Sequence, residues 1–464
     1  MTNTGRKVFV IGLDCAAPEL VFERWRDLLP NLNRLMSRGV YGNLTSCTPA
    51  ITVPAWSVMT SSKDPGTLGI YGFRNRADWS YDKMSIATGS AVKVDRVWDI
   101  LSRSGRRVNV VGVPGTYPPR SVNGCLVGCF LTPSIASNYT YPPEFKKEIA
   151  EWVGEYWVDV KDFRTEDKDY LLRQIYEMTR VRCQLVKRMI ADKPWDFFMF
   201  VEMGVDRIHH GMWSYTDEGH WRFEPNNKYI NSIRDYYIYL DREIGEMLAL
   251  LPEDTVVMVA SDHGAKRMDG GIAVNEWLRR EGYLVLAQDT PATMTPFERV
   301  KVDWARTKAW SSGGYYARIF MNVQGREPNG LVALADYERE RDELARRLIA
   351  IPGPNGEDIH TQVFKPEDLY HEVNNIAPDL IVYFGDLYWR SVGSLGLDSI
   401  YTFENDTGPD DANHAQQGMF ILHDPARDLG GRRLQAGIMD IAPTVLHYMD
   451  EPIPADMQGK IIDA

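Results

Sequence analysis

The sequence predicts an α/β fold in which a mostly parallel central sheet is sandwiched between helices. Three observations lead to this prediction. Short, continuous apolar runs recur along the chain, helical patterns separate them, and acidic residues stand directly after several of the runs. Strands of a parallel sheet are buried on both faces, so they are apolar without alternation. Active sites of such sheets lie at the carboxyl ends of strands, where these acidic residues occur.

Five apolar runs are expected to form strands of this sheet. Each is continuous rather than alternating and is bounded by glycine, proline or charged residues. Their ranges are 8–13, 107–113, 195–202, 255–260 and 418–422.

Helical spacing of apolar residues predicts helices between these strands. Leu32, Leu35 and Met36 lie on one face of the first, and Gly39 ends it. Residues 230–251 form a longer amphipathic pattern with one apolar stripe.

Two segments interrupt the alternation of strands and helices. Residues 137–190 are rich in tyrosine, tryptophan and charge and have a helical pattern, whereas residues 265–405 have mixed patterns. We therefore expect a catalytic core made of residues 1–264 and 406–464, with a helical insertion at about 137–190. Residues 265–405 are expected to form an inserted cap that determines substrate specificity, because loops on a rigid sheet usually carry it.

The composition limits the partners of this 464-residue chain. Its 52 Lys and Arg against 64 Asp and Glu give a formal net charge of −12, which argues against binding a nucleic-acid polymer. A small phosphorylated substrate remains compatible, because bound cations can dominate a local field. No apolar run reaches the length of a membrane span or a signal-peptide core. We therefore predict a cytoplasmic protein without a membrane partner, and the sequence leaves its oligomeric state open.

Six acidic and imidazole residues are candidate metal ligands. Carboxylates and imidazoles together suit zinc, manganese or iron. Taken singly, each has an ordinary structural explanation, such as a helix cap, a surface ion pair or a turn. Their grouping after three predicted strands is what indicates a metal site. The six are Asp14, Asp206, His210, Asp262, His263 and His414.

Asp206 and His210 are spaced i, i+4, which places both on one face of a helical turn. His209 competes with His210, but its offset from Asp206 is less favourable. The five cysteines are odd in number and irregular in spacing, which favours buried free thiols over a metal cluster.

A nucleophile is expected between residues 48 and 57, where several hydroxyl groups precede a helical pattern. Thr52 lies at the expected helix start, where the helix dipole and free N–H groups favour an anionic phosphoryl oxygen. Thr48 precedes a proline, which biases it away from a helix start. Ser57 would lie more than a turn inside the helix.

These motifs, in this order, resemble the type I phosphodiesterase and nucleotide pyrophosphatase branch of the alkaline phosphatase superfamily. The resemblance covers nearly the whole chain, and Ser261-Asp262-His263-Gly264 is its most specific piece. The other matching pieces are Val10 to Asp14, Thr52-Val53-Pro54, Gly69-Ile70, Asp206-x3-His210, His414 with Gly418 and Phe420, and Met439 to Thr444.

The resemblance implies an alkaline phosphatase-like fold and two divalent metal ions, with zinc expected first and manganese as the alternative. One ion would be held by Asp206, His210 and His414. The other would be held by Asp14, Asp262, His263 and the Thr52 hydroxyl. The implied reaction is in-line attack by Thr52 on a phosphoester, which gives a phosphothreonine that water then hydrolyses.

The chain departs from the family pattern beside the nucleophile. Leu68 replaces a histidine, and Phe73 occupies the position of an asparagine that contacts the phosphoryl oxygen in nucleotide pyrophosphatases. Arg74 or Asn75 is expected to replace that contact as a substrate-binding residue.

Other reactions fit the same two metal sites. A phosphotransferase, a phosphomonoesterase and a phosphonate-ester hydrolase all remain open, and the leaving group is unspecified. A sulfatase is disfavoured because Cys47-Thr48-Pro49 does not continue into the sulfatase pattern. A non-enzymatic metal-stabilised binding module is disfavoured because neither the nucleophile nor any ligand is missing.

Overall fold

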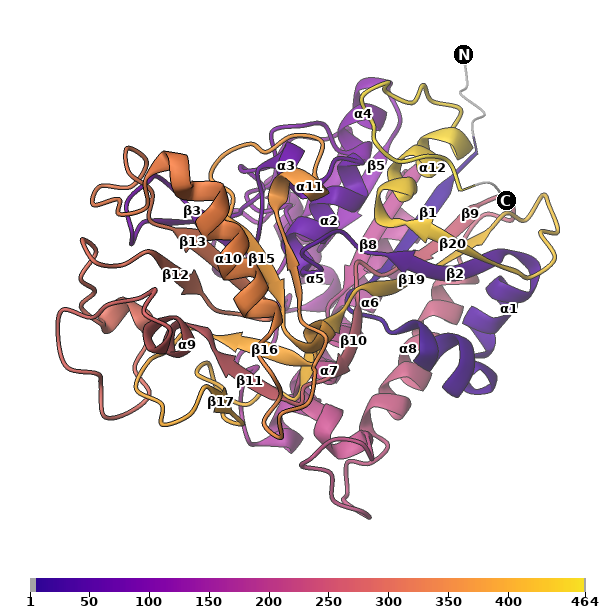
Figure 1. The fold of residues 1–464 in the computed structure, drawn as a ribbon. Helices are drawn as coiled ribbons and strands as arrows, with labels where there is room; N and C mark the ends of the chain where they lie inside the picture. The colour runs from indigo at the N-terminus through magenta and orange to yellow at the C-terminus, as the bar shows by residue number, and fades with distance from the viewer. Residues whose placement is uncertain (1–5, 463–464) are drawn as a thin grey trace.

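A twisted nine-stranded sheet runs through the centre of the computed structural model, which describes residues 6–462 (Figure 1). The strand order is β20-β2-β19-β9-β1-β8-β5-β6-β7. The strands are β1 (Val8–Leu13), β2 (Val40–Thr45), β5 (Val108–Val111), β6 (Gly124–Val127), β7 (Thr140–Tyr141), β8 (Phe197–Glu202), β9 (Val256–Ala260), β19 (Gln417–His423) and β20 (Arg432–Gly437).

The sheet is mostly parallel, as the sequence predicts. Strand β1 lies at its centre and pairs in parallel with β8 on one side and β9 on the other. Strands β5 and β6 extend the parallel set beyond β8. Only β19 and β7 run against their neighbours in this sheet. The carboxyl ends of β1, β8 and β9 therefore meet at one edge.

The five predicted strands all exist, with adjusted limits. Strand β1 has its predicted bounds, and β8 and β9 begin one or two residues later than expected. Strand β5 stops at Val111 because Gly112 has a φ of 68°, which leaves the extended conformation. Strand β19 is longer than predicted because it is hydrogen-bonded on both sides, to β2 and to β9.

Helices cover both faces of this sheet, which confirms the predicted layers. One face is covered by α1 (Pro30–Arg38), α5 (Phe145–Val153), α6 (Lys168–Asp192), α7 (Gly204–Thr216) and α8 (Ser232–Leu248). The other face is covered by α2 (Thr52–Ser61), α4 (Val97–Arg103) and α12 (Ile441–Tyr448), with the short α3 (Pro65–Leu68) beside α2. The apolar side chains of both layers and of the sheet form the largest hydrophobic core.

Segment 137–190 does not form a separate body. Helix α6 continues to Asp192, and its Leu171, Ile175 and Met178 are buried in the main core. It packs against α7 and α8, so it is a layer of the core rather than an addition to it.

Segment 265–405 contains a second hydrophobic core around its own strands (Figure 1, left). A four-stranded antiparallel sheet has the order β12-β13-β15-β14, and a smaller one has the order β16-β11-β17. Their elements are α9 (Val274–Arg280), α10 (Tyr337–Ile349), α11 (Pro366–Leu369), β11 (Gly270–Ala273), β12 (Ala309–Ser312), β13 (Ala317–Met321), β14 (Gln362–Phe364), β15 (Leu380–Tyr383), β16 (Trp389–Val392) and β17 (Tyr401–Thr402).

A third, smaller core joins this segment to the loop that precedes α2. It contains Ile51 from that loop together with tyrosines from the segment, among them Tyr316, Tyr370 and Tyr383. Among the described residues, no helix combines the length and apolar character that crossing a lipid bilayer requires.

Candidate active site

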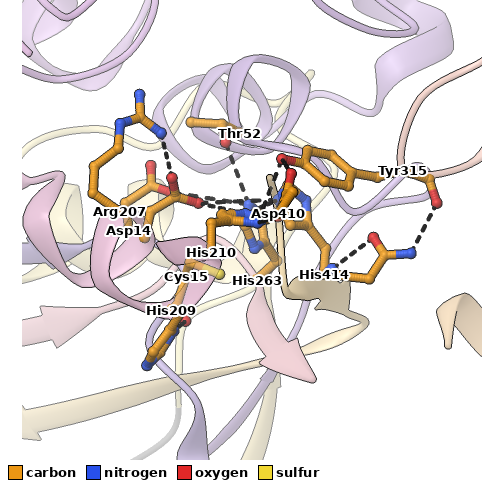
Figure 2. Close-up of polar contacts among 12 residues, drawn as sticks. Asp14, Cys15, Thr52, Arg207, His209, His210, His263, Tyr315, Asp410 and His414 are labelled. Atoms are coloured by element: carbon orange, nitrogen blue, oxygen red, sulfur yellow. Dashed lines mark hydrogen bonds and ion pairs between the residues drawn. The ribbon is translucent and has the colours of Figure 1, made fainter. Parts of the chain in front are cut away.

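Polar residues from three strand ends meet at the carboxyl edge of the sheet (Figure 2). Asp14 directly follows β1, and Asp262 with His263 follows β9 after one intervening serine, Ser261. Helix α7 begins two residues after β8 and contributes Asp206 and His210 from one face, as their spacing predicts. Asp206 Oδ1 lies 3.3 Å from His210 Nε2.

His414 is brought to the same edge by a short strand pair. Strand β18 (Ala412–Ala415) pairs antiparallel with β10 (Gly264–Arg267), which starts directly after His263. The His263 and His414 rings are stacked, with centroids 3.8 Å apart. Residues separated by 151 positions in the sequence therefore share one site through this pairing.

The ligand atoms form two groups. In the first, one atom each of Asp206, His210, His414 and Cys15 lies within 4.8 Å of the others. His210 Nε2 and His414 Nε2 are 3.2 Å apart. The second group contains Asp14, Asp262 and His263. All of these residues are buried.

The second group holds carboxylates that protein atoms do not satisfy. Asp14 Oδ1 and Asp262 Oδ2 are buried and accept no hydrogen bond. Burial, followed by the charge of Asp206, raises the pKa of Asp14 well above its ordinary value. Burial, followed by the charge of Asp14, has the same effect on the pKa of Asp262. A divalent cation would neutralise both, so this donor set fits a metal ion.

Three histidines turn Nε2 toward these groups of ligand atoms, while Nδ1 is hydrogen-bonded to a residue outside them. His210 Nδ1 lies 2.7 Å from Asp410 Oδ1, and His414 Nδ1 lies 2.9 Å from the Ala50 carbonyl oxygen. His263 Nδ1 lies 3.1 Å from the Gly264 carbonyl oxygen. With the proton on Nδ1, each Nε2 offers its lone pair, as a metal-binding histidine requires.

His209 faces away from both groups. Its Nδ1 lies 3.1 Å from the Cys15 carbonyl oxygen, and its Nε2 lies 3.2 Å from the Tyr237 hydroxyl. Both ring nitrogens are thus engaged inside the core. The geometry agrees with the choice of His210 as the candidate ligand.

Thr52 is the first residue of α2 rather than its cap, which is Ile51 in an extended conformation. Its Oγ1 lies 3.4 Å from His263 Nε2. Pro54 occupies the first turn, where its missing N–H costs no helical hydrogen bond. The N–H groups of Thr52 and Val53 precede the first intrahelical bond, which the Ala55 N–H donates to the Ile51 carbonyl oxygen, so Thr52 lies at the positive end of the helix dipole.

Tyrosines from segment 265–405 hold the turn that carries Thr52. The Ala50 N–H donates to the Tyr383 hydroxyl at 2.8 Å. The Tyr370 hydroxyl donates to the Thr48 carbonyl oxygen at 2.6 Å. The position of the candidate nucleophile therefore depends on the segment predicted to determine specificity.

A cavity of about 660 Å³ opens onto Thr52, Asp206, His210 and His414. Its wall combines aromatic and basic side chains from the core and from segment 265–405. The aromatic ones include Phe73, Tyr81, Phe130, Phe163, Trp310, Tyr315 and Tyr316, and the basic ones are Arg74, Arg76, Arg164, Arg207, Arg318 and Arg390.

Arg74 and Asn75 have different positions. Arg74 lines the cavity, and among residues 6–462 its guanidinium has no hydrogen-bond or ion-pair partner. The Asn75 side chain instead accepts from the Tyr71 N–H at 2.8 Å and donates to the Gly72 carbonyl oxygen at 3.0 Å. Its amide is occupied in closing a turn, so of the two expected substrate contacts Arg74 is the better placed.

Comparison with known families agrees with this geometry. The type I phosphodiesterase/nucleotide pyrophosphatase family matches residues 8–410. The chain belongs to this family. Membership identifies it as a phosphoester hydrolase of the phosphodiesterase and pyrophosphatase type.

Solved structures similar to this family member show the same fold. Human ectonucleotide pyrophosphatase/phosphodiesterase 5 is 14% identical with a TM-score of 0.55, and the match covers 97% of this chain and 96% of that one. An inactive variant of the murine protein, solved in complex with AMP, is also 14% identical, with a TM-score of 0.56 and the same coverage. No curated protein matches the sequence of this chain.

The structure adds residues that the sequence analysis missed. Asp410 accepts hydrogen bonds from His210, from the Tyr315 hydroxyl at 2.9 Å and from Arg164 at 3.2 Å. The Tyr315 ring packs on His414, with centroids 4.3 Å apart. No spacing rule indicates Asp410, because it precedes His414 in an irregular loop; its only signal is that acidic residues often orient metal-binding histidines.

We predict that Asp410→Asn weakens metal binding at the first group by about 10- to 100-fold, because the carboxylate that orients His210 is lost. Isothermal titration of the metal-free protein measures the affinity. The matched control is Asp411→Asn, since Asp411 bonds Ser214 instead. An equal loss in both variants would contradict a positioning role for Asp410.

We also predict that His210→Asn loses one equivalent of metal while His209→Asn retains both. Asparagine at 209 keeps a donor for the Cys15 carbonyl oxygen but removes the ring nitrogen that pairs with the Tyr237 hydroxyl. The free energy of unfolding should therefore fall by about 1–3 kcal/mol without loss of metal. Elemental analysis after dialysis gives the stoichiometry, and the reverse pattern would show that the ligand is His209.

Proposed function

We propose that this protein is a metal-dependent phosphodiester hydrolase that acts through a phosphothreonine at Thr52. The observation that carries the proposal is the position of Thr52 Oγ1, which faces the cavity at a helix N-terminus and lies 3.4 Å from His263 Nε2. A hydroxyl beside two groups of candidate ligands can serve as a nucleophile that the metals activate.

Two divalent cations are part of the proposal, with zinc first and manganese as the alternative. Asp206, His210 and His414 would hold one, and Asp14, Asp262, His263 and the Thr52 hydroxyl would hold the other. When bound, the ions would lower the pKa of the hydroxyl and neutralise charge on the phosphoryl group. The unsatisfied oxygens of Asp14 and Asp262 support their presence.

The chain's own residues account for the remaining steps. Thr52 Oγ1 forms a bond to phosphorus while the bond from phosphorus to the leaving oxygen breaks, and the hydroxyl proton ends on the leaving alcohol. Water then cleaves the bond between Thr52 and phosphorus and restores the hydroxyl. The N–H groups at the start of α2 can donate to phosphoryl oxygens throughout. The aromatic wall of the cavity limits the access of water.

A singly charged diester fits the cavity better than a doubly charged monoester. Most of its arginines are already paired: Arg207 with Asp159, Arg164 with Asp410 and Arg76 with Glu327. Among the described residues, Arg74 and Arg318 have no acidic partner. The Arg318 guanidinium donates to the Arg74 carbonyl oxygen and to the Ser312 hydroxyl, so Arg74 is proposed to contact the substrate. A volume of about 660 Å³ also leaves space for a substituent on each side of the phosphorus.

Transfer of the phosphoryl moiety to an acceptor alcohol is the alternative reaction. A pocket for such a transfer would need aromatic residues that exclude water, and Trp310, Tyr315 and Tyr316 line the cavity. Trp213, Tyr215 and Trp221 lie elsewhere. Product analysis in the presence of an added alcohol distinguishes transfer from hydrolysis.

The cytoplasmic location of the protein stays a prediction.

We expect zinc- or manganese-reconstituted enzyme to hydrolyse an aryl phosphodiester faster than the matching aryl monoester. Chelation should abolish both activities, and added metal should restore them. A substrate panel that includes a dinucleotide and a phosphonate ester gives the rates. Full activity after verified removal of metal would refute the metal-dependent part, and a preference for monoesters would refute the diester assignment.

Thr52→Ala is expected to lose several orders of magnitude in turnover while retaining metal at both sites, because only direct attack by water remains. Thr52→Ser keeps the hydroxyl and should keep much of the activity. Mass spectrometry of enzyme trapped with a slow substrate should locate the phosphoryl adduct on Thr52. An adduct on another residue, or near-native turnover of Thr52→Ala, would overturn the assignment.

A further inference from the structure

Cys15 is the one cysteine among residues 6–462 whose sulfur joins a group of candidate metal ligands. Its Sγ and one ligand atom each of Asp206, His210 and His414 lie within 4.8 Å of one another. Figure 2 shows the sulfur among the labelled histidines. The side chain is fully buried, so it is not a surface thiol that meets the site by chance.

The backbone holds Cys15 in a conformation that its residue type disfavours. Its φ is 66°, in the left-handed region that favours glycine. Two contacts fix the residue there: the Cys15 N–H donates to Asp262 Oδ1 at 3.1 Å, and its carbonyl oxygen lies 3.1 Å from His209 Nδ1. Such strain persists where the surroundings enforce it and is common at functional sites.

This conformation separates two neighbouring side chains. Asp14 belongs to the second group of ligand atoms, whereas the sulfur of Cys15 belongs to the first. Adjacent residues at the end of β1 thus reach different groups of ligand atoms. If the strand continued straight, successive side chains would point to opposite faces, and one of the two would turn away from the site.

We propose that the Cys15 thiolate is a fourth protein ligand of the metal ion in the first group, giving that ion a Cys, Asp, His, His donor set. The inference rests on the metal-binding part of the proposed function. Coordination breaks the S–H bond, forms a sulfur–metal bond and releases one proton to solvent. Four donors of these types match the number and chemistry of a tetrahedral zinc site.

The alternative is that the Cys15 side chain only fills space in the core and donates a weak hydrogen bond from its thiol. Its Sγ lies 3.4 Å from the Gly264 carbonyl oxygen, which is long but acceptable for a thiol donor. Cys47 offers a comparison with the same chemistry, because it is buried near Thr52 and its Sγ donates to the Pro49 carbonyl oxygen at 3.3 Å. It belongs to neither group of ligand atoms.

The test replaces the native metal with Co²⁺, whose bond to a thiolate gives an intense near-ultraviolet charge-transfer absorption. Metal-free protein is titrated with Co²⁺ in the wild type, Cys15→Gly and Cys47→Ala. Glycine at 15 removes the sulfur and accepts the left-handed backbone, so this variant should fold, and the thermal unfolding of each metal-free protein confirms it.

We expect the charge-transfer band in the wild type and in Cys47→Ala, and its absence in Cys15→Gly. Cys15→Gly should also bind Co²⁺ at one site at least about tenfold more weakly. Two bound ions without a sulfur band in the wild type, or a band that survives in Cys15→Gly, would overturn the proposal and leave the two-metal site intact. Failure of the wild type to bind Co²⁺ would overturn the metal-dependent function as well.

Discussion

Repulsion between buried carboxylates is the constraint around which this site is organised. Asp14 and Asp262 follow the neighbouring strands β1 and β9, and Asp206 lies in the first turn of α7 just beyond β8; all three are buried. The charges of neighbouring carboxylates add to burial in raising the pKa of Asp14 and of Asp262, and one oxygen of each receives no hydrogen bond. Sequence and sheet topology place them together. Contacts with Arg207 and His210 offset the charge of Asp206, whereas bound cations would offset the charges of Asp14 and Asp262.

Segment 265–405 contributes to the site through hydroxyl groups. Tyr383 and Tyr370 hold the turn before Thr52, and Tyr315 bonds Asp410, which in turn orients His210. A change in segment 265–405 can therefore reach the turn before Thr52 through Tyr370 and Tyr383, and a candidate ligand through Tyr315. This coupling is a physical reason why specificity and rate would change together when the segment is altered.

The sequence predicts those parts of the site that follow from periodicity. The i, i+4 spacing of Asp206 and His210 and the strand ends before Asp14 and Asp262 are local patterns, and the structure brings these residues together. Long-range pairing is not encoded locally, so the antiparallel direction of β19 and the contact of Asp410 with His210 were not predicted. Asn75 is placed less favourably than Arg74 for a substrate contact, because its amide bonds the backbone of its own turn, as polar side chains at turns often do.

Charge balance connects the sulfur of Cys15 with the choice of metal. Three carboxylates and one thiolate carry four negative charges, which equal the charge of two divalent cations. A buried cluster that is neutral overall avoids the large cost of burying net charge. A thiolate also binds zinc in preference to manganese, which favours oxygen ligands. With the cluster neutral, attraction for an anionic substrate would fall to cations outside it. Two arginines of the cavity wall, Arg74 and Arg318, have no acidic partner among the described residues, and of these only Arg318 has hydrogen-bond partners for its guanidinium.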